Sequence, residues 1–208
     1  MLARPTRRQI LGALAIALAT LGAVHAIALW KVRRAVGPGA YVLDDERPAD
    51  ETRFREILAD LEVMGRPEAA EGLASLQSDR RVWIAPALEG RQGFYVAILT
   101  VRRVYLAGER LQERVEFYDP LPPGLSEGHQ IDRAFARLNR AGTIYHEWVH
   151  SKGTEDELTA YGEELRFYDE VPRSRWYSAL RESEKRYADL ALAHAKAAAR
   201  EALGREER

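Results

Sequence analysis

His146-Glu147-Trp148-Val149-His150 places two histidines four residues apart, with a glutamate directly after the first. On a helix, residues i and i+4 lie one above the other on the same face, so His146 and His150 can present two imidazole nitrogens to one tetrahedral zinc ion. Glu147 lies next to that face, where its carboxylate can take a proton from a metal-bound water. The H-E-x-x-H spacing therefore predicts a zinc site on a helix, with His146 and His150 as ligands and Glu147 as the general base.

The motif falls near the end of a predicted helix. Apolar side chains follow helical spacing from residue 131 to about residue 151, which places the motif on the last two turns. Gly153 ends this helix, and a second helix is expected from Thr154 to about Glu170, where Pro172 breaks it. Acidic side chains on the second helix therefore follow closely after the two histidines.

The third ligand is open between several acids. The chain has no cysteine, so any metal must be bound by His, Asp or Glu. Glu157 is the first candidate, but Thr154-Glu155-Asp156-Glu157 also matches the T-x-x-E capping box, in which Glu157 bonds back to the backbone N–H of Thr154. One carboxylate can hardly serve fully in both roles. Three other acids remain as alternatives: Glu164, on the same helix face, then Glu163 and Glu155.

A β-rich stretch precedes the motif helix. Segments rich in Val, Ile, Tyr, Phe and Trp predict strands at residues 81–85, 93–101, 103–106 and 114–118. Amphipathic spacing predicts two earlier helices, at residues 48–64 and from residue 67 to about residue 77. The fold class is therefore predicted to be α+β, with a small β-sheet followed by an active-site helix and a second ligand helix.

This order of elements, with H-E-x-x-H and Glu157-Leu158-Thr159-Ala160-Tyr161, resembles the zincin metallopeptidases, in particular membrane-anchored bacterial gluzincin-like members. The resemblance covers about residues 81–170. It implies that His146, His150 and Glu157 bind Zn²⁺, and that Glu147 is the catalytic base that hydrolyses a peptide or protein substrate. It also implies that the substrate binds as an added strand along a sheet edge. The segment between His150 and Glu157 is short for a gluzincin.

Such a peptidase also stabilises the oxyanion that forms when water attacks a carbonyl. The candidates are Tyr161, Tyr168 and His129. Tyrosines at helical spacing commonly belong to a core or its rim, and His129 lies in a polar loop. Asp132 and Asp119 fit a helix N-terminal charge and a turn residue better than a catalytic role.

The N-terminus contains a predicted membrane anchor. In residues 10–30 only Thr20 and His25 are polar, and about 20 apolar residues span a bilayer as a helix. A cleaved signal peptide is the alternative, because Val24-His25-Ala26 resembles a cleavage site and residues 6–11 resemble a twin-arginine signal. The apolar run continues past Ala26, which favours a single-pass anchor. The N-terminal amine and the short N-terminal tail favour an orientation with the domain outside the cytoplasm. Cleavage would leave a secreted or periplasmic protein.

The remaining composition suits one domain with appendages. The chain has 208 residues, of which 46% are hydrophobic, and its net charge of −1 gives no argument for nucleic acid binding. The expected division is an anchor at 1–36, a zincin-like domain at 37–173 and a charged C-terminal helix at 174–208. Residues 175–208 predict a long, mostly solvated helix. A second hypothesis is a non-catalytic envelope scaffold with a zincin-like fold that docks partners through this helix.

Overall fold

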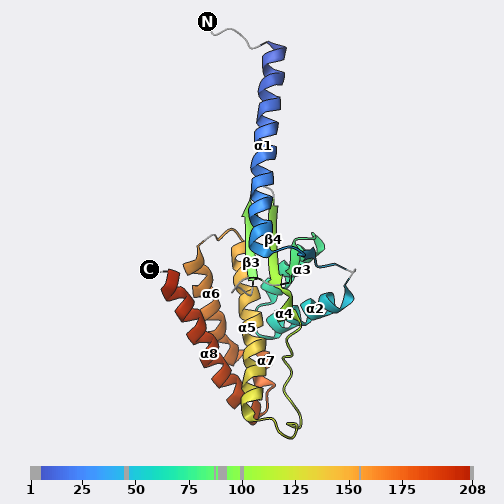
Figure 1. Ribbon diagram of the computed structural model, residues 1–208. Helices are drawn as coiled ribbons and strands as arrows, with labels where there is room; N and C mark the ends of the chain where they lie inside the picture. Colours follow the sequence, from blue (N-terminus) through green and yellow to red (C-terminus); the bar gives the residue numbers. More distant parts are fainter. Residues whose placement is uncertain are drawn as a thin grey trace.

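The computed structural model describes residues 6–44, 47–86, 88, 93–98, 101–154 and 156–206. The described chain is mostly helical and includes one small mixed sheet, which agrees with the predicted α+β class (Figure 1). In chain order the elements are α1 (Arg7–Val36), β1 (Tyr41–Val42), α2 (Pro48–Val63), α3 (Pro67–Ser78), β2 (Val82–Ala85), β3 (Gly93–Ile98), β4 (Val101–Ala107), α4 (Gly108–Leu111), α5 (Glu127–Ser151), α6 (Glu157–Glu170), the 3₁₀ turn η1 (Val171–Arg173), α7 (Arg175–Ser178) and α8 (Glu182–Glu206).

The sheet has the strand order β1-β2-β4-β3. The central pair β2 and β4 is parallel, whereas β1 on β2 and β3 on β4 are antiparallel. Strand β3 is therefore an edge strand that pairs with β4, with Gly93 opposite Leu106. Its other side is the sheet edge nearest to the helices that carry the motif.

Alternating side chains divide the sheet into two faces. The inner face packs into the main core together with α5, and includes Val82, Ile84, Val104 and Leu106. The outer face packs against the last turns of α1, and includes Trp83, Ala85, Val96, Tyr105 and Ala107. One short sheet thus supports two separate hydrophobic clusters.

Helix α5 lies between the sheet and two later helices, α6 and α8, which pack along it (Figure 1). Helix α8 was expected to be mostly solvated, but one of its faces is buried. Alanines occur at the contact positions, and their small side chains allow close approach of α8 to its neighbours. The buried residues are Ala188, Ala191, Leu192, Ala195 and Ala199.

The predicted strand at residues 114–118 is wrong. This segment runs beside α5 without regular structure. The Gln130 side chain accepts a hydrogen bond from the Tyr118 backbone N–H at 2.8 Å and donates one to the Tyr118 carbonyl at 2.9 Å. A side-chain amide here satisfies the backbone groups that a neighbouring strand would otherwise pair. The expected break near residue 102 is also misplaced, because β4 already begins at Val101.

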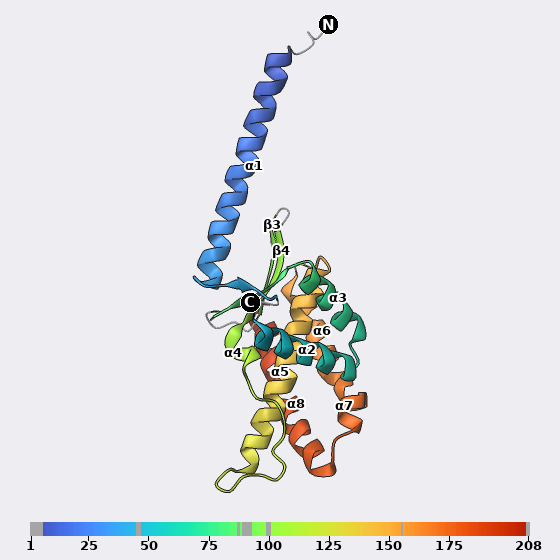
Figure 2. The same cartoon turned by 90° about the vertical axis from the view of Figure 1, so that its right-hand side faces the viewer.

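Helix α1 projects away from the rest of the protein (Figure 2). Its segment Arg7–Arg34 has a mean hydropathy of 2.2 over its most apolar window, and none of that window is buried. Within the described chain it is the one helix long and apolar enough to cross a membrane. The same length and composition also suit a signal sequence near the N-terminus.

Candidate metal centre

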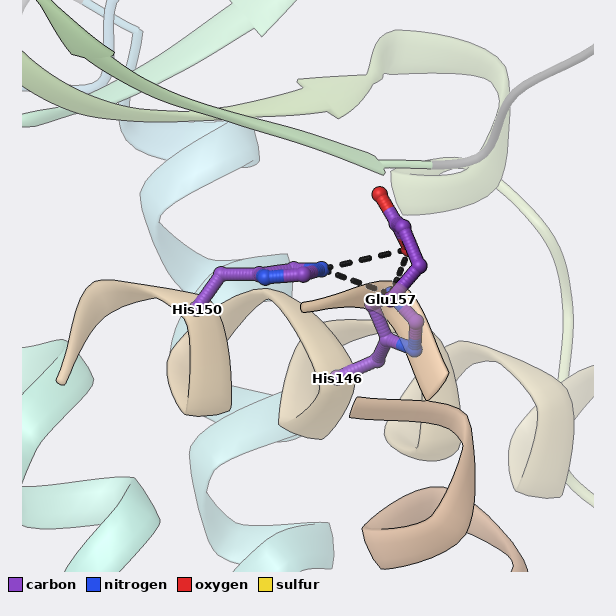
Figure 3. A group of neighbouring side chains, drawn as sticks. All are labelled: His146, His150 and Glu157. Atoms are coloured by element: carbon purple, nitrogen blue, oxygen red, sulfur yellow. Dashed lines mark hydrogen bonds and ion pairs between the residues drawn. The ribbon is translucent and has the colours of Figure 1, made fainter. Parts of the chain in front are cut away.

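The last two turns of α5 carry both motif histidines, and α6 starts beside them. His146 Nε2 lies 3.0 Å from His150 Nε2, and these two atoms lie 3.2 and 3.3 Å from Glu157 Oε2. Figure 3 shows the three side chains turned toward one another. The structure thus brings together His146, His150 and Glu157, which are the three residues predicted as ligands.

The capping interpretation of Glu157 is wrong. Helix α6 begins at Glu157, and its N-cap is Asp156, whose carboxylate accepts hydrogen bonds from Leu158 N at 3.2 Å and Thr159 N at 3.0 Å. An N-cap side chain satisfies backbone N–H groups that have no partner within the helix. Because Asp156 performs this function, the Glu157 carboxylate is free to face the histidines.

Each histidine is oriented by a partner on its other ring nitrogen. His150 Nδ1 lies 2.6 Å from the Thr154 carbonyl oxygen, which can only accept, so Nδ1 carries the hydrogen. His146 Nδ1 lies 3.2 Å from Glu164 Oε2, and the buried Tyr168 hydroxyl donates to Glu164 Oε1 at 2.9 Å. In the neutral rings, both Nε2 lone pairs therefore point at the same place as the Glu157 carboxylate.

This arrangement assigns the alternative acids to other positions. Glu164 lies behind His146, where second-layer carboxylates that orient metal-binding histidines are commonly found. Glu163 accepts a hydrogen bond from the Tyr145 hydroxyl at 3.4 Å and pairs with Arg166 at 2.8 Å. Glu155 lies outside the described residues.

The donor set fits a small divalent cation. Two imidazole nitrogens and one carboxylate oxygen are borderline-soft and hard ligands of the kind that zinc and several other transition metals bind. Ligand atoms about 2.0–2.1 Å from a tetrahedral ion are separated by about 3.3 Å, and the observed separations are 3.0, 3.2 and 3.3 Å. The geometry suits a divalent metal ion, but it does not distinguish zinc from other transition metals.

The pKa values of these groups follow from burial and mutual contact. Burial alone would lower the pKa of His146, but hydrogen bonds to Glu157 and Glu164 outweigh it and raise the pKa to about 9. The hydrogen bonds from His146 and His150 hold the pKa of Glu157 well below its usual range. Without a metal, His146 therefore remains protonated and positively charged at neutral pH.

Glu147 lies beside this group and faces a cavity. The residue is 6% exposed, and burial raises the pKa of its carboxyl to about 7 despite the opposing charges of His146 and His150. The cavity has a volume of about 570 Å³ and is lined by α5, α6, α8 and strand β3. Glu147 is thus a buried carboxyl with a pKa near neutrality at the wall of a cavity that also contains the histidines.

Strand β3 approaches Glu147 through a glycine. A Cβ atom at Gly93 would lie 2.7 Å from Glu147 Cγ and 2.9 Å from its Oε1, closer than real Cβ atoms pack. Any side chain at this point of the strand would displace the Glu147 carboxyl. We did not predict a role for Gly93, although a glycine inside a strand pattern is a general indication of close approach.

Of the three candidates for oxyanion stabilisation, Tyr161 alone lines the cavity. Its ring centroid lies 4.5 Å from that of His146. Tyr168 is fully buried and donates to Glu164, and His129 caps the opposite end of α5 through Ser126. The Asp119 carboxylate forms an ion pair with Arg181 at 2.8 Å, and Asp119 does not line the cavity.

The wall opposite the motif comes from α8, which the sequence did not place there. Ala195, Ala198, Ala199 and Ala202 line the cavity, with Arg205 at the end of the helix. Comparisons with known proteins add no constraint on the site, because no protein family, no curated protein and no solved structure matches this chain.

Proposed function

We propose that this chain is a zinc-dependent metallopeptidase. One observation carries the proposal: His146 Nε2, His150 Nε2 and Glu157 Oε2 converge within 3.0–3.3 Å, beside the buried carboxyl of Glu147. The convergence supports a metal site, and the adjacent carboxyl supports hydrolysis, because a structural metal site needs no buried base at its cavity.

The residues divide the chemistry among them. A zinc ion held by His146, His150 and Glu157 supplies a Lewis acid that polarises a carbonyl and acidifies water. Glu147 takes a proton from the attacking water and passes it to the leaving amine, a role that suits a buried carboxyl at the cavity wall. Glu164 and the Thr154 carbonyl hold the two imidazoles in the orientation that directs their Nε2 atoms to the metal.

The substrate is proposed to be an extended peptide. Strand β3 is the last strand in the order β1-β2-β4-β3, and Gly93, Phe94, Tyr95 and Ala97 line the cavity that contains Glu147. An extended peptide can pair with such an edge through main-chain hydrogen bonds. Pairing there would bring a peptide carbonyl alongside the carboxyl of Glu147.

Helix α1 is proposed to remain as a single-pass anchor that holds the domain outside the cytoplasm. Its exposed apolar surface supports the anchor, because apolar side chains are exposed continuously along the helix over a length that can span a bilayer. The last turns of α1 pack against the outer face of the sheet, so that the helix continues into the folded domain.

The test uses the full chain purified in detergent. We expect close to one zinc per chain in the native protein and none in His146→Ala. The variant Glu147→Gln should retain zinc and lose at least about 10²-fold in peptide hydrolysis, since it removes the general base. Glu163→Gln, on the α6 surface, is the matched control and should be fully active.

Two outcomes would contradict the proposal. Undiminished hydrolysis in zinc-loaded Glu147→Gln would exclude the mechanism. Zinc binding by the native chain without hydrolysis of a broad peptide library would instead favour the scaffold hypothesis. The scaffold hypothesis uses the C-terminal helix, α8, to dock partners. In the structure, however, the apolar face of α8 is already packed against α5 and α6.

A further inference from the structure

A second cavity lies on the outer face of the sheet, where α1 meets the domain. Its volume is about 970 Å³. One wall is the last part of α1 and the segment that follows it, and the other wall is formed by side chains of β2 and β4. The lining residues are Ala26, Leu29, Trp30, Val32, Arg33, Arg34, Val36, Gly37, Pro38, Gly39, Ala40, Trp83, Arg103 and Tyr105. We call this space the juxtamembrane groove.

The groove is basic and aromatic. Arg33, Arg34 and Arg103 line it, and no Asp or Glu occurs among the described lining residues. The Arg103 guanidinium stacks over Trp83 at 4.2 Å and donates to the Tyr105 hydroxyl at 3.4 Å. None of the three arginines forms an ion pair with a described acidic residue. Stacked guanidinium groups without an acidic partner suit recognition of a phosphate.

The apolar part of the groove is continuous with the exposed surface of α1. Leu29 and Trp30 line it, and Trp30 belongs to the apolar surface that stays exposed along the helix. A bilayer core about 30 Å thick takes about 20 helical residues, so an anchor ending near Trp30 puts the arginines at the level of the lipid headgroups. The groove therefore offers apolar surface on the membrane side and positive charge on the domain side.

We propose that the juxtamembrane groove binds an anionic phospholipid. Its phosphate contacts Arg33, Arg34 and Arg103, and an acyl chain lies along Leu29 and Trp30. The site goes beyond the proposed peptidase function and does not depend on it. A bound lipid would connect α1 to strand β4 and so fix how the domain sits on the membrane surface.

Arg103 distinguishes this site from general attraction of basic residues to the membrane. Basic residues next to any spanning helix attract anionic lipid. Arg103, in contrast, comes from the sheet and reaches the groove from the domain side. Lys31 supplies a matched control, because it is an exposed cation on the same turns of α1 and does not line the groove.

The experiment titrates the full chain in detergent with phosphatidylglycerol or phosphatidylcholine and counts bound lipids by native mass spectrometry. We expect one phosphatidylglycerol per chain, bound in preference to phosphatidylcholine. Arg103→Gln should weaken its retention about fivefold or more, and Lys31→Gln should leave it within twofold. Arg34→Gln, on an exposed helix surface, should act in the same direction as Arg103→Gln without risk to the sheet.

Equal losses in Arg103→Gln and Lys31→Gln would reduce the effect to general electrostatic attraction and overturn the proposal. Equal retention of the two lipids by the native chain would also overturn it. Thermal melting and zinc content, measured for every variant, show that a loss of lipid comes from the groove and not from unfolding. Because zinc and lipid are measured separately, failure of one proposal leaves the other intact.

Discussion

The cavity on the inner side of the sheet and the juxtamembrane groove on its outer side are lined by charged side chains of opposite sign. On the inner side, Glu147, Glu157 and Glu164 surround two histidines. On the outer side, three arginines line the groove beside α1 with no described acid among them. The strand residues that line the cavity come from β3, whereas those that line the groove come from β2 and β4. The comparison teaches that one small sheet can border both a place suited to a cation and a place suited to an anion.

The largest effect should come from a single methyl group on the inner side. Gly93→Ala puts a Cβ atom against Glu147 Cγ, where only 2.7 Å is available, so the carboxyl must move. A displacement of about 1 Å in a catalytic group costs on the order of 100-fold in rate. We therefore expect about 100-fold slower peptide hydrolysis, with zinc content and bound lipid unchanged.

Gly162→Ala is the control for Gly93→Ala. Nothing lies within 4 Å of a Cβ atom at Gly162, which is in the middle of α6. The variant should keep full activity and gain about 0.5–1 kcal/mol of stability, since alanine favours a helix over glycine. Full activity in Gly93→Ala would mean that Glu147 does not act where the structure places it.

A smaller effect should follow from weakening the hydrogen bond that orients His146 from the side away from Glu157. Glu164→Gln weakens the hydrogen bond to His146 Nδ1 and removes a negative charge. Loss of such partners commonly lowers metal affinity by about 10–100-fold. We expect this fall in competition titrations with a zinc chelator. Tyr168→Phe removes one bond further out and should have a weaker effect in the same direction.

An unchanged zinc affinity in Glu164→Gln would show that Glu164 does not orient His146. A complete loss of zinc, equal to that in His146→Ala, would instead make Glu164 a ligand. Lipid binding at the outer face should not respond in either variant, because the two faces share no charged residue.

Sequence reasoning predicted which side chains come together more reliably than it predicted their surroundings. The i, i+4 spacing of His146 and His150 fixes their shared face, because helix geometry is local. Whether Glu157 caps or faces the histidines depended on where α6 begins, and a shift of two residues, from Thr154 to Asp156, moved the cap. Helix ends are set by competing local hydrogen bonds, so a sequence pattern leaves both possibilities open.

Long-range packing was the part that the sequence could not show. The alanines of α8 are compatible with a solvated helix or with close packing, and only the tertiary structure places Ala195 and Ala199 at the cavity. Gly93 is similar, since its neighbour Glu147 lies more than fifty residues away in the chain. The segment at 114–118 has the composition of a strand, but the Gln130 side chain makes the hydrogen bonds to Tyr118 that a neighbouring strand would make.

Metal binding on the inner side should depend on pH in a defined direction, because His146 must lose a proton. The pKa of His146 is raised to about 9 by Glu157 and Glu164, so below that pH the metal-free group holds a proton that a metal must displace. Zinc affinity should therefore rise about tenfold per pH unit toward pH 9 and level off above it.

Calorimetry in buffers of different ionisation enthalpy measures this proton directly. About one proton should be released per zinc bound at pH 8 in the native chain, and fewer above pH 9. Proton release that stays constant up to pH 10 would mean that His146 is not the group displaced. No His, Asp or Glu is among the described residues that line the groove, so lipid binding should change far less than zinc binding across the same interval.

The smallest effect should come from removing the N-cap of α6. This change tests the stability of the helix and leaves the side chains of the metal centre in place. Asp156→Ala removes the acceptor for Leu158 N and Thr159 N and should cost about 0.5–2 kcal/mol in chemical denaturation. Thr154→Ala is its control, because the observed contact of Thr154 uses its backbone carbonyl, and its cost should stay below about 0.5 kcal/mol. A larger cost for Thr154→Ala than for Asp156→Ala would restore the T-x-x-E capping box and take Glu157 away from the metal.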